Sequence, residues 1–193
     1  RGLGDVYKRQ IGMGMTLNRL KKIWDNGEYA LNGWLSINNS FIAEIMSRQN
    51  YDTLTIDMQH GLIDYSDLIG MLQGITGSNV TPIVRVPWLN PGYIMKALDA
   101  GAQGIISPMI NNKKEAEEFV SYMRYPPLGN RSFGPTRQNI VQGSDYYKTA
   151  NENVLCIGMI ETAEAMKNLE EIISTDGLDA VYIGPADLTL GTT

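Results

Sequence analysis

The chain has 193 residues, of which 43% are hydrophobic and 19% charged, a balance typical of one globular domain with a sizeable core. Its formal net charge of −5 at pH 7 argues against nucleic acid as a main partner, because phosphate binding needs clustered Lys and Arg. No apolar run reaches the ~18 residues of a membrane-spanning helix. With a single cysteine and no secretory signal, we therefore expect a cytoplasmic protein that contacts neither nucleic acid nor membrane.

The first residues differ from the rest of the chain. Residues 1–12 include no starting methionine and show no apolar period, so we expect a non-native or disordered leader there. Residues 13–193 are expected to form a single domain. Leu17, Leu20 and Ile23 have helical spacing and predict its first helix. The single cysteine, Cys156, lies in an apolar run, where a core position is expected rather than a nucleophile.

From Leu31 onward, strand-like runs alternate with helix-length segments, which is typical of a parallel sheet built from βα units. Strands are predicted at 31–37, 53–57, 81–86, 104–108, 154–160 and 180–183. Helices are predicted at 41–49, 65–74, from 91 onward, 113–123 and 163–174. Residues 124–151 interrupt the period and predict a long loop, either a lid or a subunit contact.

The regular alternation of strands and helices, together with the lack of a Gly-rich phosphate motif, favours an α/β TIM (β/α)8 barrel over a Rossmann sheet. A complete barrel typically takes ~250 residues, so about six βα units are expected here, with the last two missing. An open barrel of this kind would leave two strand edges unpaired.

Polar residues follow the predicted strands at their carboxyl ends, where parallel α/β folds place their chemistry. The strand 53–57 ends in Asp57, and His60, the only histidine, follows it. A core histidine held by a hydrogen bond is the structural alternative. A functional role is favoured because four later strands end in the same way, at Arg85, Pro108, Glu161 and Asp187.

Glu161 and Asp187 end consecutive strands, and neighbouring strands lie ~4.8 Å apart, so their carboxylates are expected to converge. Two carboxylates and water suit Mg²⁺ or Mn²⁺, with coordination positions left for substrate oxygens. Each acid also has a structural alternative. Glu161 would be an acid at a helix N-terminus, where the helix dipole stabilises it, and Asp187 would cap the helix after Pro185. The occurrence of both acids at strand ends favours the metal site.

Arg85 ends an apolar strand and needs an anion, which predicts a clamp for a substrate carboxylate. The alternative is an internal partner, Asp57 or Asp99. Asp99 ends a predicted helix, where the dipole disfavours an acid, and His60 is the candidate that compensates for it. Trp34 either walls the pocket or fills the core.

Eight motifs stand in an order and spacing that resembles the HpcH/HpaI aldolase family, over residues 15 to 191. They are Asn32-Gly-Trp34, Asp57-Met-Gln-His-Gly61, Val84-Arg-Val-Pro87, Leu98-Asp-Ala-Gly-Ala-Gln-Gly104, Pro108-Met109, Arg124-Tyr-Pro-Pro-Leu-Gly-Asn-Arg131, Ile160-Glu-Thr162 and Gly184-Pro-Ala-Asp-Leu188. The family comprises class II pyruvate-dependent aldolases, typified by 4-hydroxy-2-oxoheptanedioate aldolase. The resemblance implies a TIM barrel that is truncated at its C-terminal end.

The resemblance implies a metal-dependent carbon–carbon lyase that cleaves 4-hydroxy-2-oxo acids to pyruvate and an aldehyde. Glu161 and Asp187 would ligate Mg²⁺ or Mn²⁺, with Co²⁺ as a further option, and the metal would stabilise the pyruvate enolate. No lysine ends a predicted strand, which agrees with a route that needs no Schiff base. The family also implies a homo-oligomer, a trimer of dimers, and a role in aromatic compound catabolism.

Further roles are carried over from the family. Arg85 would hold the pyruvate carboxylate, and His60, supported by Asp99, would transfer protons. Asp57 would lie beside metal-bound water. Three further residues would help to hold pyruvate: Gly184, Pro185 and Ala186.

Two positions depart from the family pattern. Gln59 stands where a Glu is common, and Met159 stands where a Gln touches the substrate. Because Met donates no hydrogen bond, we expect a different aldehyde half or a different substrate pose.

Two other functions stay open. The first is a citrate-lyase-like or malyl-CoA-type lyase, or a decarboxylase, on the same barrel. A CoA substrate would need a basic entrance, for which the segment 124–137 offers Arg124, Arg131 and Arg137. The second is a non-catalytic fragment that binds partners through the segment 125–147.

Overall fold

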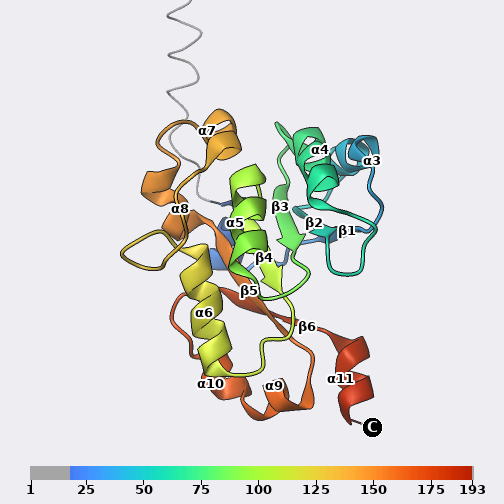
Figure 1. Cartoon of the computed structure of the whole chain (residues 1–193). Helices are drawn as coiled ribbons and strands as arrows, with labels where there is room; N and C mark the ends of the chain where they lie inside the picture. The colour runs from blue at the N-terminus through green and yellow to red at the C-terminus, as the bar shows by residue number, and fades with distance from the viewer. Residues whose placement is uncertain (1–17, 193) are drawn as a thin grey trace, which may run out of the picture.

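The computed structural model describes residues 18–192, and the predicted leader at 1–12 lies outside this range. Its centre is a six-stranded parallel sheet in the order β1-β2-β3-β4-β5-β6 (Figure 1). The strands are β1 Asn32–Leu35, β2 Thr53–Asp57, β3 Thr81–Arg85, β4 Gly104–Ser107, β5 Leu155–Ile160 and β6 Ala180–Ile183. The predicted alternation of strands and helices is confirmed.

Helices connect the successive strands and cover the outside of the sheet, while α2 precedes β1 and α11 follows β6 (Figure 1). They are α2 Arg19–Asp25, α3 Ser40–Ser47, α4 Tyr65–Ile75, α5 Pro91–Ala100, α6 Lys113–Met123, α7 Thr136–Gln142, α8 Tyr147–Asn153, α9 Ala163–Lys167, α10 Leu169–Ile173 and α11 Pro185–Thr192. Within the described range, none of them is both long and apolar enough to cross a membrane.

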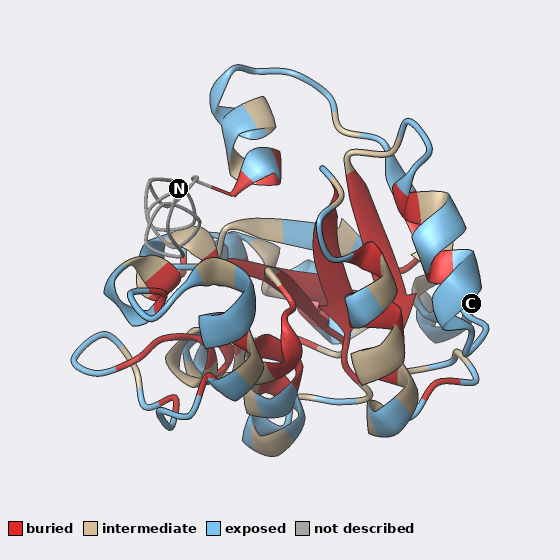
Figure 2. Ribbon diagram, turned by 90° about the horizontal axis from the view of Figure 1, so that it is seen from above, coloured by how far each residue is buried: buried red, intermediate tan, exposed pale blue. Residues whose placement is uncertain are grey.

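The sheet is curled, and its two faces bury different side chains. The larger core lies between the strands and the helices outside them, and buried residues concentrate on the strands (Figure 2). The inner face carries a smaller apolar cluster: Leu20, Ile83, Ile106, Leu155, Ile157 and Met159. Trp34 on β1 and Tyr182 on β6 contact each other across this face, with ring centroids 5.6 Å apart. Because β1 and β6 are the two edge strands, this contact requires a concave inner face.

Cys156 of β5 is completely buried, and its burial raises the pKa of the thiol well above the ordinary value. A thiol that stays protonated is a poor nucleophile. The predicted core role of this cysteine is therefore confirmed.

Two segments differ from the predicted pattern. Residues 124–151 contain α7 and α8 instead of an irregular loop, because the segment buries its own small cluster of Tyr125, Tyr146 and Ala150. The predicted helix 163–174 is divided into α9 and α10 at Asn168. The side-chain amide of Asn168 donates to the carbonyl of Asn111, 2.9 Å away, which ties the break to the segment after β4.

Candidate active site

The polar ends of the strands gather at one edge of the sheet. The parallel register pairs Asp57 with Arg85 at the ends of β2 and β3, and β5 is followed at once by Glu161. Gly184 links β6 to α11. The arrowheads of β3 and β4 in Figure 1 point toward the end of the molecule where α9, α10 and α11 lie. The predicted strand-end residues therefore share one end of the fold.

Arg85 and Asp57 form a buried bidentate ion pair. Nε of Arg85 donates to Oδ1 of Asp57 at 2.8 Å, and Nη2 donates to Oδ2 at 2.6 Å. Burial would raise the pKa of Asp57, but the hydrogen bonds and charge of Arg85 outweigh it and the pKa is lowered. The remaining nitrogen, Nη1, faces the Met159 sulfur at 3.9 Å. Arg85 thus has the internal partner considered for it, and its Nη1 edge faces the inner side of the sheet.

Asp57 also organises the loop that carries His60. Its Oδ1 accepts hydrogen bonds from the backbone N–H of Gln59 at 3.0 Å and of His60 at 3.3 Å. A Cβ at Gly61 would lie 2.1 Å from the carbonyl oxygen of Asp57, so only glycine fits there. The His60 side chain is exposed and forms no hydrogen bond with the described residues, which leaves its imidazole accessible to a ligand.

Trp34 lines the same end of the fold. Its indole N–H donates to Oδ2 of Asp57 at 3.3 Å, and the Arg85 guanidinium lies 4.9 Å from its ring centroid. Its other neighbour is Tyr182. Trp34 is partly buried, packs against the inner-face apolar cluster and lies beside Asp57 and Arg85.

Glu161 is almost completely buried, at 1% exposure. Its Oε1 accepts a hydrogen bond from the backbone N–H of Met109 at 2.8 Å, whereas its buried Oε2 has no partner in the part of the chain that the structure describes. Burial raises the pKa of Glu161, and the charge and the hydrogen-bond-range approach of the Asp187 carboxylate raise it further, while the Met109 N–H and the charge of Arg85 oppose this rise. The two carboxylates therefore lie close enough to repel each other.

The residues around Glu161 fit a divalent cation. Gly184 packs so closely that a Cβ there would lie 2.9 Å from Oε2 of Glu161. Asp187 lies in the first turn of α11, directly after the exposed Pro185 and Ala186. No group of three or more His, Cys, Asp or Glu suited to a metal occurs within residues 18–192. The acids that lie close together here are Glu161 and Asp187. An unpartnered buried carboxylate oxygen beside a second acid suits Mg²⁺ or Mn²⁺, which complete their coordination with water or substrate oxygens.

Replacing Gly184 by Ala should disrupt this arrangement. The new methyl group would lie 2.6 Å from Cε of Met159 and 2.8 Å from Cβ of Glu161, which forces both side chains to move. We expect roughly tenfold weaker Mn²⁺ binding and a loss of about 1–3 kcal/mol in the free energy of unfolding. The measurements are a Mn²⁺ titration and chemical denaturation.

Gly191→Ala is the matched control, because the nearest atom to its Cβ would be the backbone nitrogen of Ala163 at 3.9 Å. It should leave both quantities near the parent values. Normal Mn²⁺ affinity in Gly184→Ala would show that close packing at this position does not hold Glu161 in place.

The structure does not bring Asp99 to His60. Asp99 is in the last turn of α5, which runs back along the sheet, and Gln103 just beyond it donates to the carbonyl of Pro82 at the start of β3. Asp99 therefore lies toward the amino ends of the strands, whereas His60 lies at the carboxyl ends. The expected support of His60 by Asp99 is not a contact within this chain.

The partner of Asp99 is the buried Arg131, whose Nη2 donates to Oδ1 at 2.6 Å. Burial raises the pKa of Asp99, and the hydrogen bond and charge of Arg131 oppose this rise. The Arg131 guanidinium also lies 4.4 Å from the ring centroid of Tyr125. This cluster anchors the segment 124–151 to α5.

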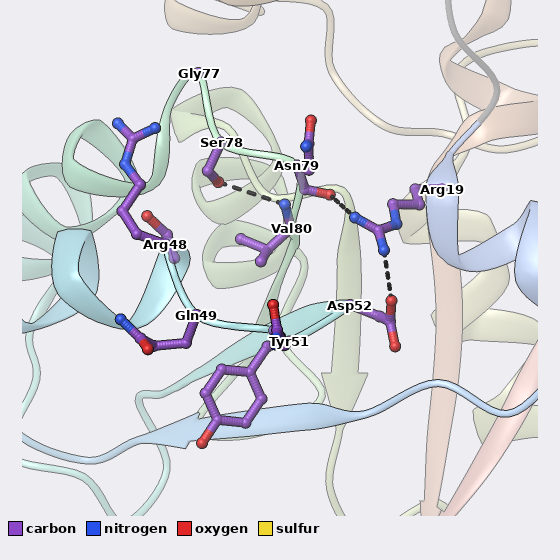
Figure 3. A pocket seen from close by; sticks show the side chains of 11 residues that line it. Arg19, Arg48, Gln49, Tyr51, Asp52, Gly77, Ser78, Asn79 and Val80 are labelled. Carbon is purple, nitrogen blue, oxygen red and sulfur yellow. Dashed lines mark hydrogen bonds and ion pairs between the residues drawn. The ribbon is translucent and has the colours of Figure 1, made fainter.

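A pocket of about 480 Å³ opens at the amino ends of β2 and β3, away from the candidate site. Figure 3 shows Arg19 between the carboxylate of Asp52 and the carbonyl of Asn79, with hydrogen bonds of 2.6 and 3.1 Å. The lining residues are Arg19, Ser47, Arg48, Gln49, Asn50, Tyr51, Asp52, Gly77, Ser78, Asn79 and Val80. Because its best-placed charges already pair with each other, we assign the chemistry to the opposite end.

Sequence reasoning missed three residues around the site. Tyr182 could have been found, because it precedes Gly184 by two positions and a strand places such residues on one face. Met109 contributes a backbone N–H, and Asn111 contributes side-chain bonds to the residues around it. The residue types Met and Asn do not by themselves indicate either of these two roles.

Fold and site together define an α/β protein of the curled parallel-sheet type, with a charged site at the carboxyl ends of its strands. The family model described as HpcH/HpaI aldolase/citrate lyase matches residues 31–192. The chain therefore belongs to the HpcH/HpaI aldolase/citrate lyase family.

Three similar proteins illustrate the relationship. The hydroxypyruvate/pyruvate aldolase of Rhizorhabdus wittichii is 45% identical over 174 residues, covering 90% of this chain and 69% of its own length. The 4-hydroxy-2-oxo-heptane-1,7-dioate aldolase of Escherichia coli is 37% identical over 177 residues, covering 89% and 67%. The crystal structure of a family protein from Burkholderia cenocepacia superimposes with a TM-score of 0.83 at 34% identity, covering 90% and 71%. The chain thus spans about two thirds of the length of these relatives.

Proposed function

We propose that this chain carries the reaction site of a class II, divalent-metal-dependent aldolase. It would cleave a 4-hydroxy-2-oxo acid to pyruvate and an aldehyde. The observation that carries this proposal is the buried, unpartnered Oε2 of Glu161 beside Asp187, on the same edge of the sheet as Arg85. The two relatives named as aldolases support the reaction class.

Each residue has a defined task in this reaction. Glu161 and Asp187 would hold Mg²⁺ or Mn²⁺, with Co²⁺ as a further option, and the bound cation would supply Lewis-acid polarisation of the 2-keto group. Arg85, held by Asp57 through Nε and Nη2, would offer Nη1 to the substrate carboxylate. The loop of 184–186 would lie against pyruvate.

His60 is the proposed proton carrier. Its accessible imidazole would take the proton of the 4-hydroxyl group as the C3–C4 bond breaks, and the bonding electrons move onto C3 and the 2-keto oxygen. The same group would later return a proton to C3, which yields pyruvate. Met159 beside Nη1 of Arg85 makes this part of the site less polar than a Gln would. It therefore supports a substrate other than a dicarboxylate.

The complete domain is proposed to be a TIM (β/α)8 barrel with two further βα units after residue 193. The curled sheet and its edge strands β1 and β6 support this proposal. We also propose a homo-oligomer, supported by exposed apolar side chains such as Phe41, at 66% exposure, and Leu62, at 77%. Asp99 could assist His60 only across such an assembly, because within this chain its carboxylate is paired with Arg131.

The structure weakens the alternative with a CoA substrate. Arg124 is bound to the Val154 carbonyl and Asp179, and Arg131 is bound to Asp99. Arg137 donates to carbonyl oxygens, including that of Leu72. The three arginines expected at a basic entrance are therefore engaged inside the protein.

Exchange of the pyruvate methyl protons in D₂O tests the proposal without knowledge of the aldehyde. NMR should show exchange with Mg²⁺ and loss of exchange after EDTA, for this chain or for one extended by two βα units. Exchange by the extended chain alone would support the site and show that the shorter chain is incomplete. Failure of a folded, metal-bound, extended chain to exchange these protons would refute the pyruvate chemistry.

A further inference from the structure

Met109 has an unusual backbone conformation. Among residues 18–192 it is the one non-glycine residue with a positive φ, at 58°. The left-handed region costs a residue with a side chain roughly 1–2 kcal/mol, so surrounding contacts must hold it there. This conformation accompanies the hydrogen bond from the Met109 N–H to Oε1 of Glu161, at 2.8 Å. The strain thus lies at the residue that orients the buried carboxylate.

Asn111 holds this strained segment from its other side. Its side-chain amide donates to the carbonyl of Met109 at 2.9 Å, and its Oδ1 accepts a hydrogen bond from the hydroxyl of Thr162. Thr162 directly follows Glu161. One side chain therefore ties together the residue that binds Oε1 and the backbone that carries the carboxylate.

The backbone of Asn111 is itself fixed at both ends. Its N–H donates to Oε2 of Glu115 at 2.7 Å, and its carbonyl accepts from Asn168 at 2.9 Å. Asn111 is thus anchored to α6 and to the break between α9 and α10. Because its backbone is anchored in this way, the Asn111 side chain can hold Met109 in its left-handed conformation.

Helix capping does not explain these contacts. The cap of α6 is Asn112, whose Oδ1 accepts from the N–H of Glu115 at 3.0 Å. The cap of α9 is Thr162, whose hydroxyl oxygen accepts from the N–H of Ala165 at 3.0 Å. The bonds of Asn111 to Met109 and Thr162 are additional to both caps.

We propose that Asn111 is a positioning residue for Glu161. It holds Met109 in the left-handed conformation, so that the Met109 N–H occupies Oε1 and Oε2 is left for a cation shared with Asp187. This inference rests on the proposed function, which supplies the cation. Outer partners of this kind typically contribute about 10–100-fold to metal affinity.

The test is a Mn²⁺ titration of the protein, with free Mn²⁺ measured by electron paramagnetic resonance. Asn111→Ala should bind Mn²⁺ about tenfold or more weakly than the parent. Asn112→Ala is the matched control, since it removes a helix cap, at a typical cost of about 1 kcal/mol, and leaves Met109 and Thr162 untouched. Its Mn²⁺ affinity should equal that of the parent.

A rescue variant separates positioning from general loosening. Glycine adopts positive φ without penalty, so a glycine at position 109 should no longer need Asn111 to hold its backbone. The double variant Met109→Gly with Asn111→Ala should therefore bind Mn²⁺ as tightly as Met109→Gly alone. If circular dichroism shows that Asn111→Ala does not fold, Asn111→Ser, whose side chain is too short to span both partners, is measured with the same expectation.

The outcomes distinguish the two levels of the proposal. A parent protein that binds no Mn²⁺ would overturn the metal site and this inference together. Parent binding with equal affinity in the Asn111 variants would overturn this inference alone. Equal weakening by Asn112→Ala, or no recovery in the double variant, would show that Asn111 acts on stability and not on Glu161.

Discussion

Glu161→Gln should abolish metal-dependent pyruvate exchange while the protein stays folded. Gln has the same shape but is a poorer ligand for a hard cation, and metal stabilisation of developing charge is worth several kcal/mol. A loss on the order of a thousandfold in exchange rate is expected, since each ~1.4 kcal/mol is a factor of ten. Asp187→Asn should act in the same direction. Glu164→Gln in the exposed first turn of α9 is the control.

The same substitution should raise the stability of the metal-free protein. The pKa of Glu161 is raised in the folded state, so its stabilising contribution is present at low pH and is lost as pH rises through the folded pKa. Above the folded-state pKa, the charged carboxylate is therefore a destabilising group that Gln removes. Thermal unfolding at pH 7 without metal should show a higher midpoint for Glu161→Gln, and added Mg²⁺ should stabilise only the parent. Retained exchange with ordinary metal dependence would refute the ligand assignment.

Arg85→Lys should weaken pyruvate binding more than it slows the chemistry. The Arg85 guanidinium binds Asp57 through Nε and Nη2 and leaves Nη1 free for the substrate. The single ammonium group of a lysine cannot bind Asp57 and the substrate carboxylate with the same geometry at once. Hydrogen bonds to charged groups are worth about 1.5–3 kcal/mol, so the apparent KM for pyruvate should rise roughly 10–100-fold.

Arg19→Lys is the control for this substitution, because Arg19 also pairs with an aspartate, Asp52, but at the amino end of the sheet. It should leave KM unchanged. An unchanged KM in Arg85→Lys, measured from the concentration dependence of proton exchange, would remove Arg85 from the substrate-binding site.

The fold could be predicted from sequence because its signals are local. Alternating β-branched residues such as those of 53–57 mark buried strands, and Asn or Thr caps mark helix starts at Asn39 and Thr162. Parallel topology then places strand-end residues at one edge, which is why Arg85 and Glu161 could be proposed together.

The remaining features depend on non-local geometry. The sequence predicts His60 as the partner of Asp99, but Asp99 lies in the last turn of α5 and pairs with Arg131. Met159 departs from the family pattern, but its contact with Arg85 crosses the inner face from β5 to β3, over the intervening β4, and depends on the curl of the sheet. The left-handed conformation of Met109 is imposed by tertiary contacts, and a methionine gives no sign of it.

The contact between Trp34 and Tyr182 has a consequence for the order of folding. It joins the first and last strands of the described sheet, so it brings together positions that are far apart along the chain. Contacts between such distant positions slow folding, because the entropy of closing the chain is lost before any contact compensates for it. Trp34, one of the three tryptophans of the chain, lies at this junction, so its share of the fluorescence should change when the two edge strands come together.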